Sequence, residues 1–343
     1  MENPSGPETM NLRFGAIVPE VEDRKPGVSP PFCSERLGKI QFMGDPLFRW
    51  IARISALVIP LLLAGIVFEL IRNSRLSLER FGLGFLTSQN WNPVTGEFGA
   101  LSSLYGTAVS TLIAILIALP LGLFIALFLV ELASPRISAF FGSAIELLAA
   151  IPSIIYGMWG LFVFAPFMAR YIQPLLGKSL GFLPLFQGPP MGIGILTAGI
   201  ILALMILPYI SSVTRDVFKM VPVVVKEAAY GIGATNWEVM KGVTLRYSLS
   251  GIVGATFLGL GRALGETMAV TFVIGNHHKI SLSLFSSGNS IASTLANEFT
   301  EASDPLYLSS LIELGLVLFL ITVLFQVGAQ FWLWSISRKA RSG

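Results

Sequence analysis

Two opposite charges lie inside an otherwise apolar stretch of this 343-residue sequence. Arg262 and Glu266 stand near the middle of the hydrophobic run 251–274. On insertion scales each charge costs about 2.5–3.5 kcal/mol at the centre of a bilayer, so such residues face protein or a water-filled path. If the run is one α-helix, the four-residue spacing places both side chains on one face. The spacing therefore suggests a functional site inside a membrane segment.

Two interpretations of this pair remain open. In the first, Arg262 and Glu266 form a buried intrahelical ion pair that only fixes packing, although base-before-acid is the poorer order along a helix. In the second, the planar guanidinium of Arg262 offers several donors to an oxyanion. Glu266 then balances the arginine while the site is empty and keeps the anion from staying bound. The second interpretation assigns both residues to a substrate pathway.

Small residues recur every four positions beside the two charges. Such a row lets neighbouring membrane helices approach closely, which predicts a central place for this helix in a bundle. The row consists of Gly251, Ala255, Gly259 and Ala263.

The composition is that of an integral membrane protein. Hydrophobic residues make up 53% of the chain and charged residues 13%, whereas soluble domains carry about 25% charged residues. Mean hydropathy is +0.73. The single cysteine, Cys33, excludes an intramolecular disulfide framework and a cysteine-cluster metal site. We expect a lipid membrane around the chain, no metal site and no nucleic-acid partner.

The chain divides into a tail and a transmembrane domain. Residues 1–50 are rich in proline, glycine, serine and charge, and we expect a largely disordered tail. Residues 51–343 are expected to form an all-α domain whose spans can cross ~30 Å of hydrocarbon. The proline-rich stretch 165–192 is predicted to form an irregular external loop or a shallow re-entrant segment. The six predicted spans are 51–71, 104–130, 144–164, 193–213, 251–274 and 308–334.

The distribution of basic residues sets the expected orientation. Of the 23 Lys and Arg residues, 16 lie on the side that holds both termini and the loops 131–143 and 214–250. Cytoplasmic loops carry an excess of Lys and Arg. We therefore expect a multi-pass inner-membrane protein with both termini and the 214–250 loop in the cytoplasm.

The loop 214–250 carries a second pattern. Glu227, Ala228 and Ala229 favour a helix, Gly231 and Gly233 interrupt it, and Thr235 or Asn236 can cap a second helix that starts at Trp237. The pattern predicts a cytoplasmic helix–turn–helix of small residues, which a partner's groove could approach closely. An ordinary amphipathic loop would show the same spacing.

This loop resembles the EAA loop of ABC importer permeases, on the matching residues Glu227, Ala228, Ala229 and Gly233. The resemblance implies a coupling helix that sits in a cleft of an ATPase subunit and transmits its closure to the spans. One position departs from the family pattern, because Arg246 stands where the family has proline.

Two further segments resemble the phosphate-specific ABC importer permeases. They are 259–276, with the run Gly-Leu-Gly-Arg-Ala-Leu-Gly-Glu-Thr-Met-Ala-Val at its start, and 151–160, which is similar to the C-type member of the permease pair. The resemblance implies a type I bundle of six transmembrane helices, with Arg262 and Glu266 taking part in phosphate movement. It implies as partners a second, related permease, two ATPase subunits and a periplasmic phosphate-binding protein.

The chain itself is expected to be a transporter subunit and not an enzyme. Gly177-Lys178-Ser179 ends like a phosphate loop, but Ile172 stands where the required glycine would be. No cofactor is therefore expected on this chain, and ATP would be bound by the partner subunit. An ABC permease for another oxyanion, such as sulfate or molybdate, would keep the same loop. An ion-coupled anion symporter would need no ATPase and would show inverted repeats.

Overall fold

Helix α9 (Ile195–Lys219) lies at the centre of the helical bundle in the computed structural model, and most of its apolar stretch is buried inside the protein. The structure describes the backbone of residues 35–341 and the side chains of residues 46–335. The chain divides into two units, residues 1–62 and 63–343. The described part of the first unit is helix, and the candidate site residues discussed below all lie in the second unit.

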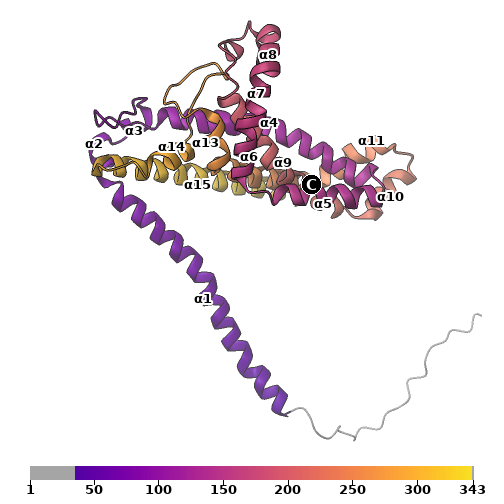
Figure 1. The fold of residues 1–343 in the computed structure, drawn as a ribbon. Helices are drawn as coiled ribbons and strands as arrows, with labels where there is room; N and C mark the ends of the chain where they lie inside the picture. The colour runs from indigo at the N-terminus through magenta and orange to yellow at the C-terminus, as the bar shows by residue number, and fades with distance from the viewer. Residues whose placement is uncertain (1–34, 342–343) are drawn as a thin grey trace, which may run out of the picture. The chain divides into compact units, whose positions relative to one another are not determined.

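All regular elements in the described residues are helices (Figure 1). The α-helices are α1 (Glu35–Asn73), α2 (Arg75–Phe81), α3 (Gly84–Thr87), α4 (Leu101–Leu127), α5 (Pro135–Ala149), α6 (Ser153–Trp159), α7 (Ala165–Phe167), α8 (Gln173–Leu180), α9, α10 (Val223–Gly231), α11 (Asn236–Val239), α12 (Leu245–Leu264), α13 (Met268–Ile274), α14 (Ile291–Glu298) and α15 (Pro305–Arg341). Short π-helical segments are η1 (Phe128–Leu132), η2 (Gly160–Phe164), η3 (Met168–Ile172) and η5 (Met240–Thr244), and η4 (Pro184–Phe186) is a 3₁₀ turn.

Six helical stretches are long and apolar enough to cross a membrane, which confirms the predicted number of spans and the all-α membrane fold. Their bounds are Pro46–Asn73, Leu101–Leu132, Ser153–Leu180, Ile195–Lys219, Asn236–Leu264 and Pro305–Ser335.

The amino-terminal and third spans differ from the predicted bounds. Residues 1–34 of the predicted tail lie outside the described residues, and the chain is helical from Glu35 onward. The predicted third span, 144–164, is interrupted at residues 150–152, because Pro152 lacks an N–H and disfavours helix in the residue before it. Helix then continues to Leu180 through the stretch predicted to be irregular. Two of its prolines, Pro166 and Pro174, lie just after the π-helical segments η2 and η3, where the regular α-helical hydrogen bonding is already interrupted.

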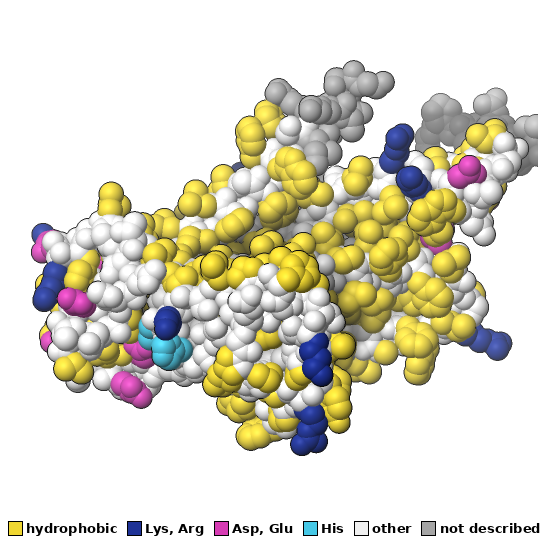
Figure 2. Space-filling view, turned by 90° about the horizontal axis from the view of Figure 1, so that it is seen from above, with side chains coloured by type: hydrophobic (Ala, Val, Ile, Leu, Met, Phe, Trp, Pro, Cys, Tyr) yellow, Lys and Arg dark blue, Asp and Glu magenta, His cyan; other side chains and the backbone are white. Residues whose placement is uncertain are grey.

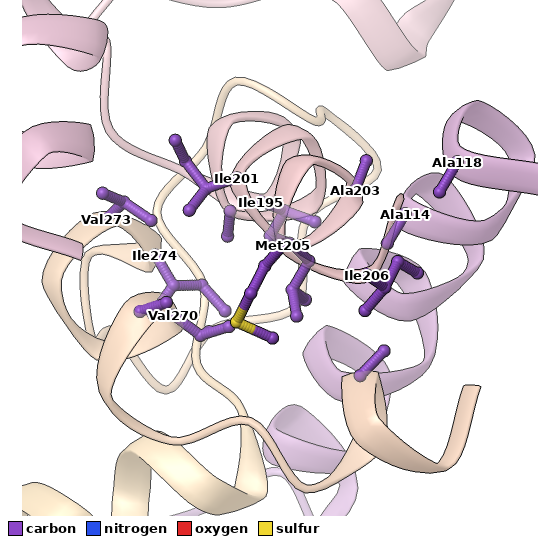
Figure 3. Close-up of a cluster of buried hydrophobic side chains, with 14 of the residues drawn as sticks. Ala114, Ala118, Ile195, Ile201, Ala203, Met205, Ile206, Val270, Val273 and Ile274 are labelled. Atoms are coloured by element: carbon purple, nitrogen blue, oxygen red, sulfur yellow. The ribbon is translucent and has the colours of Figure 1, made fainter. Parts of the chain in front are cut away.

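The largest cluster of buried apolar side chains surrounds α9 (Figure 3). Four helices contribute to it: Ile195, Ile201, Ala203, Met205 and Ile206 come from α9, Ala114 and Ala118 from α4, Ala263 from α12, and Val270, Val273 and Ile274 from α13. Inside a membrane the hydrophobic effect does not drive helices together, because lipid tails are as apolar as the side chains. Close van der Waals packing of this kind therefore holds a membrane bundle together. The cluster thereby fixes α13 against α9.

Helices α10 and α11 lie at one end of the bundle, and α2 and α3 lie at the opposite end (Figure 1). On the face shown in Figure 2, hydrophobic side chains form broad patches across the middle, and acidic side chains lie toward the ends. This distribution suits a protein whose middle lies in hydrocarbon and whose ends reach water.

Candidate functional site

The fifth span is broken at the predicted site. It was expected to be continuous over 251–274, but α12 ends at Leu264 and α13 begins at Met268. Arg262 is in the last turn of α12, whereas Glu266 lies in the break. The expectation that both side chains share one helix face is therefore wrong. Gly265 is the first residue after α12. Glycine lowers helix stability by about 1 kcal/mol relative to alanine, which favours an end to the helix at this point.

Glu266 satisfies a backbone group that the break exposes. Its Oε1 accepts a hydrogen bond from the backbone N–H of Ala269 at 3.2 Å. The first N–H groups of a helix have no partner within the helix, and a side-chain oxygen just before the helix commonly caps one of them. The Glu266 side chain is buried and stabilises the start of α13.

Arg262 contacts an aromatic ring from another helix. Its guanidinium carbon lies 4.3 Å from the centroid of the Tyr209 ring, which belongs to α9. Its Nε is buried without a hydrogen-bond partner. Among the ion pairs found in the described residues, none includes Arg262. The intrahelical pair with Glu266 is thus not formed, and the arginine faces a π-system and has no carboxylate partner.

Two tyrosines connect the arginine to the break in the third span. The hydroxyl of Tyr209 donates to the carbonyl of Ala149 at 3.2 Å, and the hydroxyl of Tyr156 donates to the carbonyl of Leu148 at 2.9 Å. Both carbonyls belong to the last turn of α5, where helical hydrogen bonding stops. The carbonyl of Leu148 also accepts a hydrogen bond from the Ile151 N–H at 3.4 Å. The break at 150–152 and the guanidinium of Arg262 are therefore joined through the Tyr209 side chain.

Small residues allow the broken segments to lie close together. A Cβ on Gly157 of α6 would lie 3.1 Å from the Cα of Ala269 and from the carbonyl oxygen of Met268, both in α13. A Cβ on Gly251 or Gly259 of α12 would lie within 3.0 Å of side-chain atoms of α9. The predicted row of small residues thus packs α12 against α9, and Gly157 brings α6 against α13.

The loop 214–250 forms two short helices with a turn between them. α10 ends at Gly231, and Gly233 has a φ of +89°, a backbone conformation that favours glycine. Thr235 caps α11: its Oγ1 accepts from the Glu238 N–H, while the Glu238 carboxylate accepts from the Thr235 N–H. The helix–turn–helix predicted from the sequence is present, and it is Thr235 and not Asn236 that serves as the cap.

The four motif residues of this loop lie on a mostly exposed surface. Glu227, Ala228 and Gly233 are exposed, and Ala229 is half-buried. Two large apolar side chains beside them are also exposed, Ile232 at 88% and Trp237 at 61%. An uncovered apolar surface rimmed by polar groups commonly marks a protein interaction site.

Arg246, where the related loops have proline, lies on the surface of α12. Helix runs without a break from Asn236 through η5 to Leu264. A proline would remove a helical hydrogen bond at that point. No helix break occurs at Arg246, and one uninterrupted helix runs from the turn at Thr235 to the Arg262 region.

Comparison with known proteins identifies the family. Residues 118–333 match the family described as the binding-protein-dependent transport system inner membrane component. A phosphate transport system permease protein PstC of Mesorhizobium japonicum is 54% identical over 303 residues, which are 87% of this chain and 92% of the relative. The PstC protein of Pasteurella multocida is 52% identical over 280 residues, 80% of this chain and 87% of its own. The chain belongs to this permease family, within its PstC group.

A solved bacterial ABC transporter involved in the import of the acidic polysaccharide alginate also aligns with this permease. The alignment has a TM-score of 0.49 and 16% identity, and it covers 83% of this chain and 98% of the other.

Membership of this family confirms several predictions. The permease is a multi-pass membrane subunit and not an enzyme, and it belongs to an ABC system that contains other permease and ATPase subunits. In the part of the chain that the structure describes, no three His, Cys, Asp or Glu side chains gather in a way that could hold a metal ion.

A cluster that the sequence did not reveal lies at the end of the permease opposite α10 and α11 (Figure 1). Glu298 accepts hydrogen bonds from Trp91 Nε1 at 2.6 Å and from the Tyr307 hydroxyl at 2.7 Å, and its carboxylate lies 2.8 Å from His278 Nε2. The rings of His278 and Trp91 are stacked. Burial opposes the charged form of Glu298, but the hydrogen bonds from His278, Tyr307 and Trp91 outweigh it and lower its pKa.

This cluster joins four segments: the loop after α3, the loop after α13, the end of α14 and the start of α15. No local motif marks it, because its members are single residues from different loops and helices. Tyr209 was missed for the same reason, since an isolated tyrosine in an apolar span gives no signal of its own.

Proposed function

We propose that this permease forms half of the pathway by which an ATP-driven importer moves inorganic phosphate across the cytoplasmic membrane. The observation that carries the proposal is Arg262, a guanidinium without an ionic partner among the described residues, held over Tyr209 beside two helix breaks. A planar guanidinium binds the oxygens of a phosphate in bidentate fashion. The relatives named phosphate transport permeases support this choice of substrate.

Glu266 complements this role. Irregular backbone at membrane depth is tolerated where it lines a cavity or is buried in protein, so the break at 265–267 suits a segment that borders the pathway. The carboxylate holds the start of α13 and places a negative charge near the arginine. This negative charge weakens the binding of phosphate to Arg262, so that the phosphate can be released.

We expect partners at both ends of the permease, the end formed by α10 and α11 and the opposite end, as well as within the membrane. A second, related permease supplies the other half of the pathway. Two ATPase subunits bind and hydrolyse ATP, so this chain itself needs no cofactor, and each ATPase subunit holds one coupling loop. The exposed residues Glu227, Ala228 and Gly233 form part of that contact, with Ala229 beneath them. A periplasmic phosphate-binding protein delivers the anion to the opposite end.

The orientation rests on the Lys and Arg distribution. Both termini and the α10–α11 loop lie in the cytoplasm. Closure of the ATPase subunits displaces this loop, and the uninterrupted helix from Asn236 to Leu264 carries the displacement to Arg262. The pathway then alternates between outward and inward access.

Uptake assays in membrane vesicles test this function. Vesicles that hold the complete transporter are supplied with ATP on the cytoplasmic side and with labelled phosphate or labelled sulfate together with the binding protein. We expect phosphate uptake that stops when the ATPase subunits are omitted. Uptake that persists without them would indicate an ion-coupled symporter, and uptake of sulfate but not phosphate would overturn the substrate assignment.

A further inference from the structure

A single carboxylate oxygen joins three separate segments at the coupling-loop end. Oε1 of Glu131 lies 2.6 Å from Nζ of Lys226 and accepts a hydrogen bond from Oγ1 of Thr244 at 2.8 Å. Glu131 belongs to η1, which continues α4. Lys226 belongs to α10 and directly precedes the Glu227 motif, and Thr244 ends η5, immediately before α12.

The junction is shielded from water. The side chains of Glu131 and Lys226 are only 10% and 16% exposed, and Thr244 is fully buried. A buried apolar cluster made by α4, α9 and α12 lies beside it. Its buried members are Ala126, Leu127, Phe218 and Ile252. In such surroundings an ion pair is screened little, and loss of one partner leaves an uncompensated charge.

Helix α10 therefore presents different residues on its two sides. Lys226 points to the bundle and is held there, whereas Glu227 and Ala228, the next residues, are exposed. A partner protein that binds the exposed Glu227 and Ala228 does not need to contact Lys226. If α10 shifts, Glu131 must therefore move with it, or the short, largely buried ion pair between Lys226 and Glu131 must break.

The junction also reaches the helix that carries Arg262. Thr244 directly precedes α12, and Arg262 stands 18 residues further along the same continuous helix. At 1.5 Å per residue this helix spans about 27 Å. Glu131 lies in η1, the segment that continues α4, and α4 packs against α9 in the largest apolar cluster. One displacement of α10 can thus be passed to both α4 and α12.

We propose that Glu131, Lys226 and Thr244 form the mechanical junction of this permease, which couples movement of α10 to α4 and α12 together. Glu131 and Lys226 are positioning residues: they contact neither substrate nor ATP. The proposal rests on the proposed function, because it assumes that α10 is moved by an ATPase subunit.

The test measures the number of phosphate ions imported per ATP hydrolysed by the complete transporter in vesicles. Variants Glu131→Gln and Lys226→Met remove one charge each, and Thr244→Val removes the hydroxyl. We expect the complexes to assemble and to hydrolyse ATP, while Glu131→Gln and Lys226→Met lower the transport-to-hydrolysis ratio by at least about fivefold, the lower end of typical coupling effects. Thr244→Val should give a smaller decrease.

Three further variants separate coupling from simple stability. Lys226→Arg keeps the charge, and the exchange of the two residues, Glu131→Lys with Lys226→Glu, restores an ion pair; both should return the ratio to within about twofold of the parent, less than a typical coupling effect. Glu146→Gln is the matched control, because Glu146 pairs with Arg215 at 2.7 Å and links α5 to α9 without touching α10. This control should leave the ratio unchanged.

An unchanged ratio in both Glu131→Gln and Lys226→Met would overturn the junction, and so would an equal decrease in Glu146→Gln. If either single variant fails to assemble, the exchange variant decides: an assembled complex with a low ratio would also overturn the proposal. Failure of the proposed function gives a different result, since the unmodified transporter would then import no phosphate in the same vesicles.

Discussion

The guanidinium carbon of Arg262 on α12 lies 4.3 Å from the ring centroid of Tyr209 on α9. The tyrosine is itself fixed, because its hydroxyl donates to the carbonyl of Ala149 at the end of α5. A cation over an aromatic face gains about 2 kcal/mol when desolvated. The ring therefore holds the arginine without using its hydrogen-bond donors, which stay available for an anion.

Replacement of Tyr209 tests this role. Tyr209→Leu removes the aromatic face and should weaken phosphate transport through a higher KM, by about 2- to 30-fold for a loss of 0.5–2 kcal/mol. Tyr209→Phe keeps the face and loses only the hydrogen bond to Ala149, so its KM should stay close to that of the parent. The measurement is the phosphate dependence of initial uptake rates in vesicles.

Tyr247→Leu, an exposed tyrosine of α12, is the control for this comparison. If Tyr209→Leu transported phosphate with an unchanged KM, Tyr209 would have only a packing role.

Changes at the two charged residues form the second prediction. Arg262→Gln or Glu266→Gln should abolish uptake while the complex still assembles. Glutamine at 266 keeps an oxygen that can accept from Ala269 N–H, so α13 remains capped and the loss reports on charge. Near-normal uptake in both variants would remove these residues from the pathway.

The exchange Arg262→Glu with Glu266→Arg should not restore uptake. An arginine at 266 has no acceptor for the Ala269 N–H, and the parent protein has no ion pair between the two positions to rebuild. Restored transport would show that the charges act as a structural pair. Assembly is checked by purification of the intact complex, and uptake by labelled phosphate.

The number of spans, the two short helices of the 214–250 loop and the location of the charged residues could be predicted from the sequence, because these follow from long hydrophobic runs and local turn chemistry. It did not reveal that Arg262 and Glu266 lie on either side of a helix break. Periodicity alone treats 251–274 as continuous, whereas the break depends on Gly265 and on a carboxylate that caps α13. The partners of Arg262 and Lys226 come from other helices, so no spacing within one segment predicts them.

Gly233 provides a third prediction with a built-in control. Its φ of +89° is unfavourable for alanine, and the cost is about 1–2 kcal/mol. Gly231 ends α10, and alanine there meets no atom of the protein within 4 Å and favours helix. Gly233→Ala should therefore disturb the turn and lower the stimulation of ATP hydrolysis by loaded binding protein, whereas Gly231→Ala should not. Equal losses in both would instead point to a clash of the added methyl group with the partner's groove.

The last prediction concerns the Glu298 cluster and has a defined pH dependence. Because hydrogen bonds lower the pKa of Glu298 from its ordinary value of 4.5, the charged carboxylate stabilises the folded permease. This contribution is present above pH 4.5 and is lost as the pH falls below that value toward the lower pKa of the folded state. Glu298→Gln should cost about 1.5–3 kcal/mol at pH 7.

The measurement for Glu298 is thermal unfolding of the purified permease in detergent between pH 7 and pH 3. The difference between the parent and Glu298→Gln should be constant down to pH 4.5, the ordinary value for this carboxyl group, and should shrink below it. Glu301→Gln, which changes an exposed acid three residues after Glu298, should match the parent throughout. A difference that stays the same at pH 3 would mean that the carboxylate charge contributes nothing, and that Glu298 acts only through hydrogen bonds with Trp91 and Tyr307 that do not depend on its charge.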